Sequence, residues 1–267
     1  MLLTKLFSKI KRGNKYKFNV GKRHNTTKIL YVSDLHIDVK ERVPDLQSDA
    51  DILCLCGDIG LPTHNNFKIL LNNISKQYKK IFIVAGNHDY GCTALYDEQR
   101  VAYYKPKLID LCGKFDNVYL LDNSFYDINE NTIIAGTTLW TNLENVLNIK
   151  TYNVDIDIHN KYLKHSHEFD KSINFIENIL KSNKKIIMMT HYVPSFKLIE
   201  PYYLSKGIFI NDFFTTNIEH NIKPPIIAWI CGHTHSILST NINGIYCGVN
   251  AIGYKSRKVQ HKFIYIE

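Results

Sequence analysis

Five short segments carry the side chains in this sequence whose types and spacing could do chemistry. They combine carboxylate, imidazole and amide groups, and three of them contain a glycine. The segments are Asp34-Leu35-His36, Gly57-Asp58, Gly86-Asn87-His88-Asp89, His191 and Gly232-His233-Thr234-His235. Imidazole and carboxylate groups together suit first-row divalent cations. The residue types therefore predict a metal site and a reaction assisted by metal ions.

Seven of these side chains are candidate metal ligands. They are Asp34, His36, Asp58, Asn87, His191, His233 and His235. Gathering so many polar groups in an apolar environment would be costly unless they bound a cation. Because seven ligands exceed what one ion of about four- to six-fold coordination needs, the set favours two ions. Within D-x-H and H-x-H, residues two apart in extended backbone would project to the same side.

Apolar, β-branched runs place these segments at the ends of strands. Seven runs are expected to form buried strands, namely residues 28–33, 51–56, 81–85, 118–121, 132–135, 185–190 and 226–231. The carboxyl ends of strands in open α/β sheets face the crevice where ligands bind. Segments that lie far apart in the sequence can therefore converge on one site.

The stretches between the strands have a helical period. Apolar residues at 67, 71, 74 and 78 indicate one amphipathic helix, and a longer one covers residues 158–180. Strands joined through helices pair in parallel, so they favour α/β architecture with helices outside the sheets.

The C-terminal part predicts antiparallel pairing. Asn243-Gly244 lies between residues 236–242 and 245–249 and indicates a hairpin with a tight turn. A further strand is expected over residues 259–266. We therefore expect mixed sheets. Two weakly periodic stretches, 142–157 and 195–223, are candidates for insertions over the site.

A single histidine is weak evidence for a metal site, because the chain has twelve histidines. His165 and His167 form a control pair, because side chains two residues apart on a helix point about 200° apart. Both lie in the longer predicted helix. We expect both to be solvated.

The order D-x-H, G-D, G-N-H-D, H and G-H-x-H resembles the signature of the calcineurin-like metallophosphoesterases. Every element of the signature is present between Asp34 and His235. The resemblance implies an α/β fold, a four-layer αββα sandwich of two mixed β-sheets flanked by helices, with a dinuclear site at one edge of the sheets.

The resemblance also implies a role for each residue. One ion would be bound by Asp34, His36 and His235, the other by Asn87, His191 and His233, and Asp58 would bridge the two. The ions would be Mn, Fe, Zn or Ni. A metal-bound hydroxide would attack the phosphorus, His88 would act as the general acid, and Asp89 could orient His88.

The expected activity is that of a dinuclear metal-dependent phosphohydrolase. Gly57-Asp58-Ile59-Gly60 lacks the arginine of the V-D-R-G sequence in serine/threonine protein phosphatases. This difference favours a phosphodiesterase that acts on a small molecule or nucleotide over a phosphoprotein phosphatase. The alternative is a catalytically weak or inactive scaffold of the same fold that binds other proteins.

Several residues are candidates for contact with the substrate. Asn87 and His88 belong to the predicted site, and Tyr90 and Trp140 could stack on a base or aryl group. Packing is the competing interpretation for Trp140, and Trp229 is assigned to the core. Three tyrosines near the expected entrance, Tyr192, Tyr202 and Tyr203, are open to both interpretations.

Composition and charge limit the class of protein. With 45% apolar and 22% charged residues among 267, the chain matches a packed globular protein and excludes collagen-like and disordered classes. Nine of its Lys and Arg residues precede Asp34, the first acidic residue, which leaves 24 against 25 acidic residues elsewhere. Because the body is near neutral, a nucleic-acid partner is open but unsupported.

The basic N-terminus divides the chain. We expect a flexible leader over residues 1–27 and a calcineurin-like metallophosphoesterase domain over residues 28–267. Apolar residues at 2, 3, 6, 7 and 10 could line a short helix, which would suit weak contact with an anionic membrane or organelle targeting. A solvated tail is the interpretation that we favour.

The expected location is the cytoplasm. The chain contains no run of about 18 consecutive apolar residues, so no transmembrane segment is expected. Its six cysteines include no C-x-x-C pair and are expected to be buried, reduced thiols.

Overall fold

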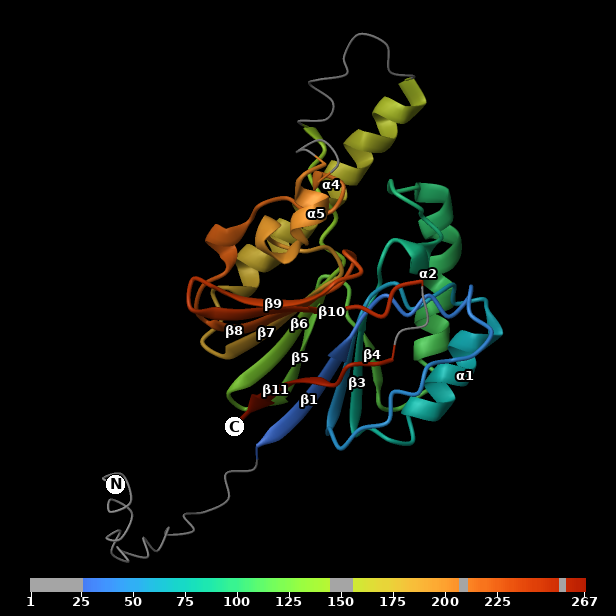
Figure 1. The fold of residues 1–267 in the computed structure, drawn as a ribbon, viewed down its shortest axis with the longest axis vertical. Helices are drawn as coiled ribbons and strands as arrows, with labels where there is room; N and C mark the ends of the chain where they lie inside the picture. The colour runs from blue at the N-terminus through green and yellow to red at the C-terminus, as the bar shows by residue number, and fades with distance from the viewer. Residues whose placement is uncertain (1–25, 145–155, 207–210, 255–257) are drawn as a thin grey trace, which may run out of the picture.

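Two β-sheets face each other, with helices on both outer sides (Figure 1). The computed structural model describes residues 26–144, 156–206, 211–254 and 258–267. Both sheets contain parallel and antiparallel pairs, so the prediction of two mixed sheets flanked by helices is confirmed.

The first sheet has five strands in the order β11-β1-β2-β3-β4. They are β1 (Thr27–Val32), β2 (Ile52–Cys56), β3 (Lys80–Val84), β4 (Val118–Leu120) and β11 (Lys262–Ile266). Strands β1 to β4 run parallel, and β11 pairs antiparallel with β1.

The second sheet has six strands in the order β5-β6-β7-β8-β10-β9. They are β5 (Ser124–Asn129), β6 (Thr132–Thr137), β7 (Lys185–Thr190), β8 (Ile226–Cys231), β9 (Ile237–Ile242) and β10 (Ile245–Asn250). The two outer strands, β5 and β9, are antiparallel to their neighbours. The predicted hairpin is β9–β10, and both residues of its turn, Asn243 and Gly244, have positive φ angles.

The helices cover the outer faces of the two sheets (Figure 1). They are α1 (Asn65–Ile74), α2 (Glu98–Cys112), α4 (Ile156–Ile179) and α5 (Pro201–Leu204), with short 3₁₀ turns η1 (His88–Tyr90), η2 (Phe196–Leu198) and η3 (Glu219–Asn221). Helices α1 and α2 lie outside the five-stranded sheet, whereas α4 and α5 lie outside the six-stranded sheet.

Alternate residues of each strand pack in two different layers. Tyr31, Phe82 and Ile187 belong to a cluster between the sheets, whereas Leu30 and Ile83 belong to the layer that also contains the buried residues of α1. Because both faces of the central strands are buried, these strands read as continuous apolar runs in the sequence. Burying one such side chain contributes about 1.5–3 kcal/mol to folding.

The strands of the two sheets meet at their carboxyl ends. An isolated parallel bridge between Ser33 and Ala251 joins the end of β1 to the end of β10. The same edge receives the loops after β2, β3, β7 and β8, and these loops carry the candidate ligands. The core therefore fixes the position of five separate loops.

Other sequence predictions have mixed outcomes. All six cysteines are buried and free, as predicted. Residues 1–25, which carry the predicted leader, and most of 142–157 lie outside the described residues. Within the described ranges, no helix is both long and apolar enough to cross a membrane.

His165 is buried, so the prediction that it is solvated is wrong. Its Nδ1 accepts a hydrogen bond from the Tyr96 N–H at 3.1 Å, and its Nε2 lies 3.1 Å from Thr141 Oγ1. On α4 it follows Tyr162 by three residues and precedes Phe169 by four, so it shares their buried face. His167 is exposed, as predicted.

We predict that His165 makes the fold sensitive to acid. Burial lowers the pKa of His165 to about 3. The unfolded chain takes up this proton near pH 6.5, so stability falls as the pH decreases from about 6.5 toward 3. Between pH 7 and pH 5 this histidine should remove about 2 kcal/mol from the free energy of unfolding, measured with urea in the presence of a chelator.

The test compares two variants of one helix. His165→Gln should lose this part of the pH dependence, although it will be less stable at pH 7. His167→Gln, which changes an exposed residue of α4, should keep it. If His165→Gln loses as much stability as the unmodified protein between pH 7 and pH 5, the buried neutral imidazole is not the cause.

Candidate metal centre

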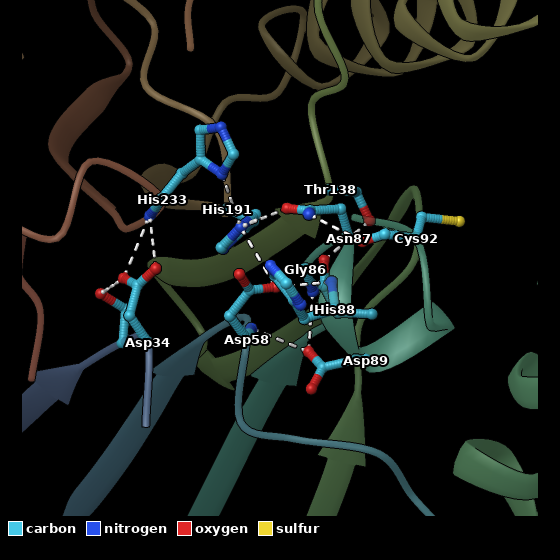
Figure 2. A network of polar contacts seen from close by, with 12 residues as sticks. Asp34, Asp58, Gly86, Asn87, His88, Asp89, Cys92, Thr138, His191 and His233 are labelled. Carbon is cyan, nitrogen blue, oxygen red and sulfur yellow. Dashed lines mark hydrogen bonds and ion pairs between the residues drawn. The ribbon is translucent and has the colours of Figure 1, made fainter. Parts of the chain in front are cut away.

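The seven predicted ligands lie together where five strands end. Figure 2 shows five of them, Asp34, Asp58, Asn87, His191 and His233. The seven ligands follow the strands in this order: Asp34 and His36 after β1, Asp58 after β2, Asn87 after β3, His191 after β7, and His233 and His235 after β8. Residues separated by about 200 positions in the chain are thus in contact. The structure brings together the whole predicted set.

The first group of donor atoms comes from Asp34, His36, Asp58 and His235, which lie within 4.8 Å of one another. The Nε2 atoms of His36 and His235 are 3.0 Å apart, and His235 Nε2 is 3.3 Å from Asp34 Oδ1. Asp58 reaches this group through Oδ2, which is 3.9 Å from His36 Nε2.

The second group comes from Asp58, His191 and His233, and Asn87 adds an amide oxygen. His191 Nε2 lies 3.1 Å from His233 Nδ1, 3.2 Å from Asn87 Oδ1 and 3.4 Å from Asp58 Oδ1. Asp58 therefore presents one carboxylate oxygen to each group.

These separations suit ligands that share an ion. With metal–ligand bonds of about 2.1 Å, two ligands at an angle of about 90–110° lie about 3.0–3.4 Å apart. Most of the measured separations fall in this interval. Each group offers imidazole and oxygen donors, and this chemistry fits a divalent cation.

Hydrogen bonds to the backbone set the orientation of the ligands. His191 Nδ1 lies 3.0 Å from the Cys56 carbonyl and His233 Nε2 lies 3.1 Å from the Phe213 carbonyl, which leaves the other nitrogen of each ring toward the site. The Asn87 amide donates to the carbonyls of Cys92 and Thr93, so its oxygen faces His191. Such outer contacts orient ligands before an ion binds.

The backbone at the ligands is strained. Five ligands have left-handed φ angles: Asp34 (55°), His36 (43°), Asp58 (53°), His233 (67°) and His235 (51°). The described part of the chain has eight non-glycine residues with positive φ, so most of them are in this site. Strain of this kind concentrates at functional sites. The expectation of extended backbone at D-x-H and H-x-H is wrong, because turns rather than strands orient these side chains.

Two glycines allow the loops to approach one another. A Cβ on Gly86 would clash with Asp58 Oδ1 and the Asp58 backbone nitrogen, and a Cβ on Gly232 would lie 2.8 Å from Asp34 Oδ2. A side chain at either position would therefore clash with a ligand-bearing loop, which explains the glycines beside the ligands.

The electrostatics of the site favour a cation. Burial alone would raise the pKa of Asp58, but His191 above all, with His88 and His36, holds it below its usual range. Burial lowers the pKa of His36 to about 4 and that of His233 to about 3, which keeps both imidazoles neutral. Neutral imidazole is the form that binds metals.

The electrostatics around His191 also favour a cation in the site. Burial would lower its pKa, but the charge of Asp58 and a hydrogen bond to it, with a further contribution from Asp34, raise the pKa to about 9. Carboxylates that attract a proton to a fully buried imidazole would equally attract a metal cation.

A cavity of about 280 Å³ opens over the two groups. Its floor contains Asp58, Asn87, His233 and His235, and its wall contains His88. Apolar and aromatic side chains complete it: Ile199, Tyr203, Phe214 and Tyr254. The cavity thus joins the donor groups to a surface that suits an organic substituent.

An Asp89 carboxylate that orients His88 would have to contact the His88 ring. Its oxygens instead face backbone N–H groups. Its Oδ2 accepts hydrogen bonds from the N–H groups of Asp58 (2.9 Å) and Gly86 (2.8 Å) (Figure 2). Its Oδ1 accepts one from Gly60 (2.8 Å). Burial and the charge of Asp58 raise the pKa of Asp89 to about 7, although the N–H donors favour the ionised form. Asp89 therefore clamps two ligand-bearing loops together.

Tyr90 and Trp140 are both buried and do not line the cavity over the ligands. Trp140 packs against Tyr96 and His165 with ring centroids 5.4 and 5.0 Å apart, which gives it a packing role. Trp229 is fully buried, as assigned.

The three tyrosines for which both substrate contact and packing were possible lie in different places. Tyr192 is buried against the His233 ring at 4.0 Å, Tyr203 lines the cavity, and Tyr202 is exposed on α5.

Sequence reasoning missed Tyr254. Its hydroxyl lies 3.0 Å from His88 Nε2, and its ring stacks on His36 with centroids 4.2 Å apart. It follows the carboxyl end of β10, so the rule that identified the other loops could have identified this one. The ligand pattern in the sequence does not include Tyr254, because it consists of carboxylate, imidazole and amide groups.

Comparison with known sequences identifies relatives. The family model described as calcineurin-like phosphoesterase matches residues 27–236. A curated protein of Acanthamoeba polyphaga mimivirus, "Uncharacterized protein L509", is 30% identical, and the match covers 85% of this chain and 91% of that protein.

Solved structures share the fold at low sequence identity. Phosphopantetheinyl hydrolase from Mycobacterium tuberculosis superposes with a TM-score of 0.62 at 15% identity, covering 90% of this chain and 95% of that one. The protein TT1561 of Thermus thermophilus gives a TM-score of 0.53 at 12% identity, covering 85% and 89%. At these identities the likeness shows the fold alone.

We predict that Asp89→Asn destabilises the loops. The asparagine has one acceptor oxygen for three N–H donors, so at least one donor loses its partner. The free energy of unfolding at pH 8, measured with chelator present, should fall by about 1–3 kcal/mol. Asp110→Asn, which changes an exposed carboxylate beside Lys114, is the control and should change stability little. Unchanged stability with a loss confined to turnover would restore the idea that Asp89 orients His88.

Proposed function

The chain belongs to the calcineurin-like phosphoesterase family, and from that premise we propose that it is a dinuclear metal-dependent phosphohydrolase. The observation that carries the proposal is the position of Asp58, whose two carboxylate oxygens face separate ligand groups beneath one cavity.

Two divalent ions would be held by the residues described above. Asp34, His36 and His235 would hold one, Asn87, His191 and His233 would hold the other, and Asp58 would bridge them. When bound, the ions would lower the pKa of a coordinated water and stabilise charge on phosphoryl oxygens. The mixture of imidazole and oxygen donors suits Mn, Fe, Zn or Ni.

His88 would be the general acid. It lines the cavity beside the ligand groups, and its backbone N–H donates to Asp58 Oδ1 at 2.9 Å, which anchors the residue next to the reaction centre. As the oxygen of a water that has released one proton to solvent bonds to phosphorus, the bond to the leaving oxygen breaks. The leaving oxygen keeps the electron pair and takes a proton from His88.

The lining of the cavity supports a phosphodiester substrate. Among the described residues that line it, none is Lys or Arg, so no fixed cation there matches the second charge of a phosphomonoester. Ile199, Tyr203 and Phe214 offer apolar surface for the second organic group of a diester. A cavity of about 280 Å³ suits a small molecule or a nucleotide. These features favour a phosphodiesterase over a phosphoprotein phosphatase.

We further propose that the chain consists of a catalytic domain and a leader, as expected from the sequence. Residues 28–267 would form the catalytic domain, and residues 1–27 would be a basic leader outside it. Removing residues 1–22 should leave hydrolysis intact if the leader has no part in catalysis.

The first experiment combines metal analysis with hydrolysis. The full-length protein is stripped with a chelator and reloaded with Mn²⁺, Fe²⁺, Zn²⁺ or Ni²⁺. Its activity is then assayed on bis(4-nitrophenyl) phosphate and 4-nitrophenyl phosphate. We expect two ions per chain, no activity in the stripped protein, and faster hydrolysis of the diester.

Two variants separate metal binding from acid catalysis. Asp58→Asn should lose bound metal, because one carboxylate serves both ligand groups. His88→Asn should keep its metal but lower kcat by about 10²–10⁴-fold. His220→Asn, which changes an exposed histidine in η3, is the control and should alter neither.

Two results would contradict the proposal. Full activity in the stripped protein would exclude a metal-dependent reaction. Two bound ions without turnover on any ester would instead favour the inactive scaffold.

A further inference from the structure

We propose that Tyr254 is a positioning residue for His88, with its hydroxyl fixing the direction in which the imidazole delivers a proton to the leaving oxygen. This inference rests on the proposed function, in which His88 is the general acid. It assigns a role to a residue outside the seven ligands and outside the family signature that was matched in the sequence.

The contact between the two side chains is direct. Tyr254 Oη lies 3.0 Å from His88 Nε2, within the range of a good hydrogen bond. The two rings meet edge to face, with centroids 6.1 Å apart and planes at 84°. Both residues line the cavity over the ligand groups. The hydrogen bond to Nε2, together with the edge-to-face contact between the His88 and His36 rings (centroids 5.0 Å apart), fixes the rotation of the imidazole.

The Tyr254 ring is itself held in place although the residue is 52% exposed. It stacks on His36 at 4.2 Å with an angle of 24° between the ring planes, and it meets His235 at 4.8 Å. The tyrosine therefore contacts both the first ligand group and His88, and the His36 and His88 rings also meet each other, with centroids 5.0 Å apart. A change of its rotamer would give up these stacking contacts.

The backbone before Tyr254 is tied to the loop after β1. Gly253 donates its N–H to the Asp34 carbonyl at 2.9 Å, and Ile252 donates to the Ser33 carbonyl at 3.0 Å. The Lys40 ammonium donates to the Gly253 carbonyl at 2.7 Å. Gly253 has a φ of 72°, so the chain turns there in a conformation that favours glycine. The hydroxyl is thus placed by the same loop that carries two ligands.

A hydroxyl suits this position because it can both donate and accept a hydrogen bond. Because the hydroxyl contacts Nε2, the proton for the leaving oxygen is the one on Nδ1, and the hydrogen bond at Nε2 holds the imidazole before and after the transfer. In the transfer, the bond between phosphorus and the leaving oxygen breaks, its electron pair stays on that oxygen, and the oxygen takes the proton that His88 held. Tyr254 gains and loses no proton in this scheme.

The test uses leaving groups that depend on the acid to different degrees. Methyl phenyl phosphate releases phenolate, whose conjugate acid has a pKa of about 10, as tyrosine does. Methyl 4-nitrophenyl phosphate releases a much weaker base, which needs little protonation. Loss of a positioned acid should therefore slow the phenyl ester more than the nitrophenyl ester.

The expected results are specific. Tyr254→Phe should lower kcat on the phenyl ester about tenfold, the worth of one hydrogen bond, with KM little changed. On the nitrophenyl ester it should lower kcat less than about twofold. His88→Asn should show the same preference with a larger loss, and the double variant should be no slower than His88→Asn. Tyr203→Phe, the matched control in α5, should change both esters by one common factor.

A second readout does not depend on activity. In the chelated protein with ¹⁵N-labelled histidine, Tyr254→Phe should shift the ring-nitrogen signals of His88 by more than Tyr203→Phe does. Equal shifts would show that the hydrogen bond is not formed and would overturn the proposal.

The kinetic outcomes separate this inference from the function beneath it. If the unmodified protein hydrolyses both esters but Tyr254→Phe slows them equally, the positioning role is wrong and the proposed function stands. The same holds if the double variant loses the full product of the two single effects. If the unmodified protein with metal bound hydrolyses neither ester, the proposed function is wrong, and the positioning role that rests on it is wrong as well.

Discussion

The Asp58 carboxylate has to stay ionised although it is buried, and the arrangement of the site follows from this constraint. A buried anion is costly unless charges or hydrogen bonds of the opposite sense surround it. Here the backbone N–H of His88 donates to one oxygen, while His191 and His36 face the two oxygens from opposite groups. Divalent cations would complete this compensation, because the imidazoles that face the carboxylate are arranged as ligands.

Main-chain hydrogen bonds make the ligand loops one unit. Asp34 N–H donates to the Gly57 carbonyl and His36 N–H donates to the Asp58 carbonyl, so the first two loops run side by side. Asp89 extends the unit to the loop after β3. The left-handed turns persist because such bonds determine them from several sides. Their strain is offset by the apolar strands, which are buried on both faces and place each loop.

Much of this arrangement could be predicted from the sequence, because two simple rules apply to it. Buried parallel strands read as apolar runs, and the polar residues at their carboxyl ends gather at one edge. These rules identified the ligand set from Asp34 to His235. The Asn243-Gly244 hairpin indicated mixed pairing, and the division into two sheets was implied by the resemblance to the family. The edge strand β5 was not predicted from the sequence, because only alternate residues are half-buried there and it has no continuous apolar run.

The remaining features depend on torsion angles and on tertiary contacts that a one-dimensional pattern does not contain. The direction of the Asp89 carboxylate is set by three backbone N–H groups from two loops. The burial of His165 depends on which face of α4 meets the sheet, and the spacing of two to His167 does not determine that. The strand-end rule can place the loop of Tyr254 at this edge, but its hydrogen bond to His88 is a tertiary contact that the sequence pattern does not contain.

The central claim is that one carboxylate joins two cation sites, and anomalous diffraction tests it most directly. Crystals of the full chain grown with Mn²⁺ should give two anomalous peaks, one on each side of Asp58, the first among Asp34, His36 and His235 and the second among Asn87, His191 and His233. A single peak, or peaks away from Asp58, would contradict the account.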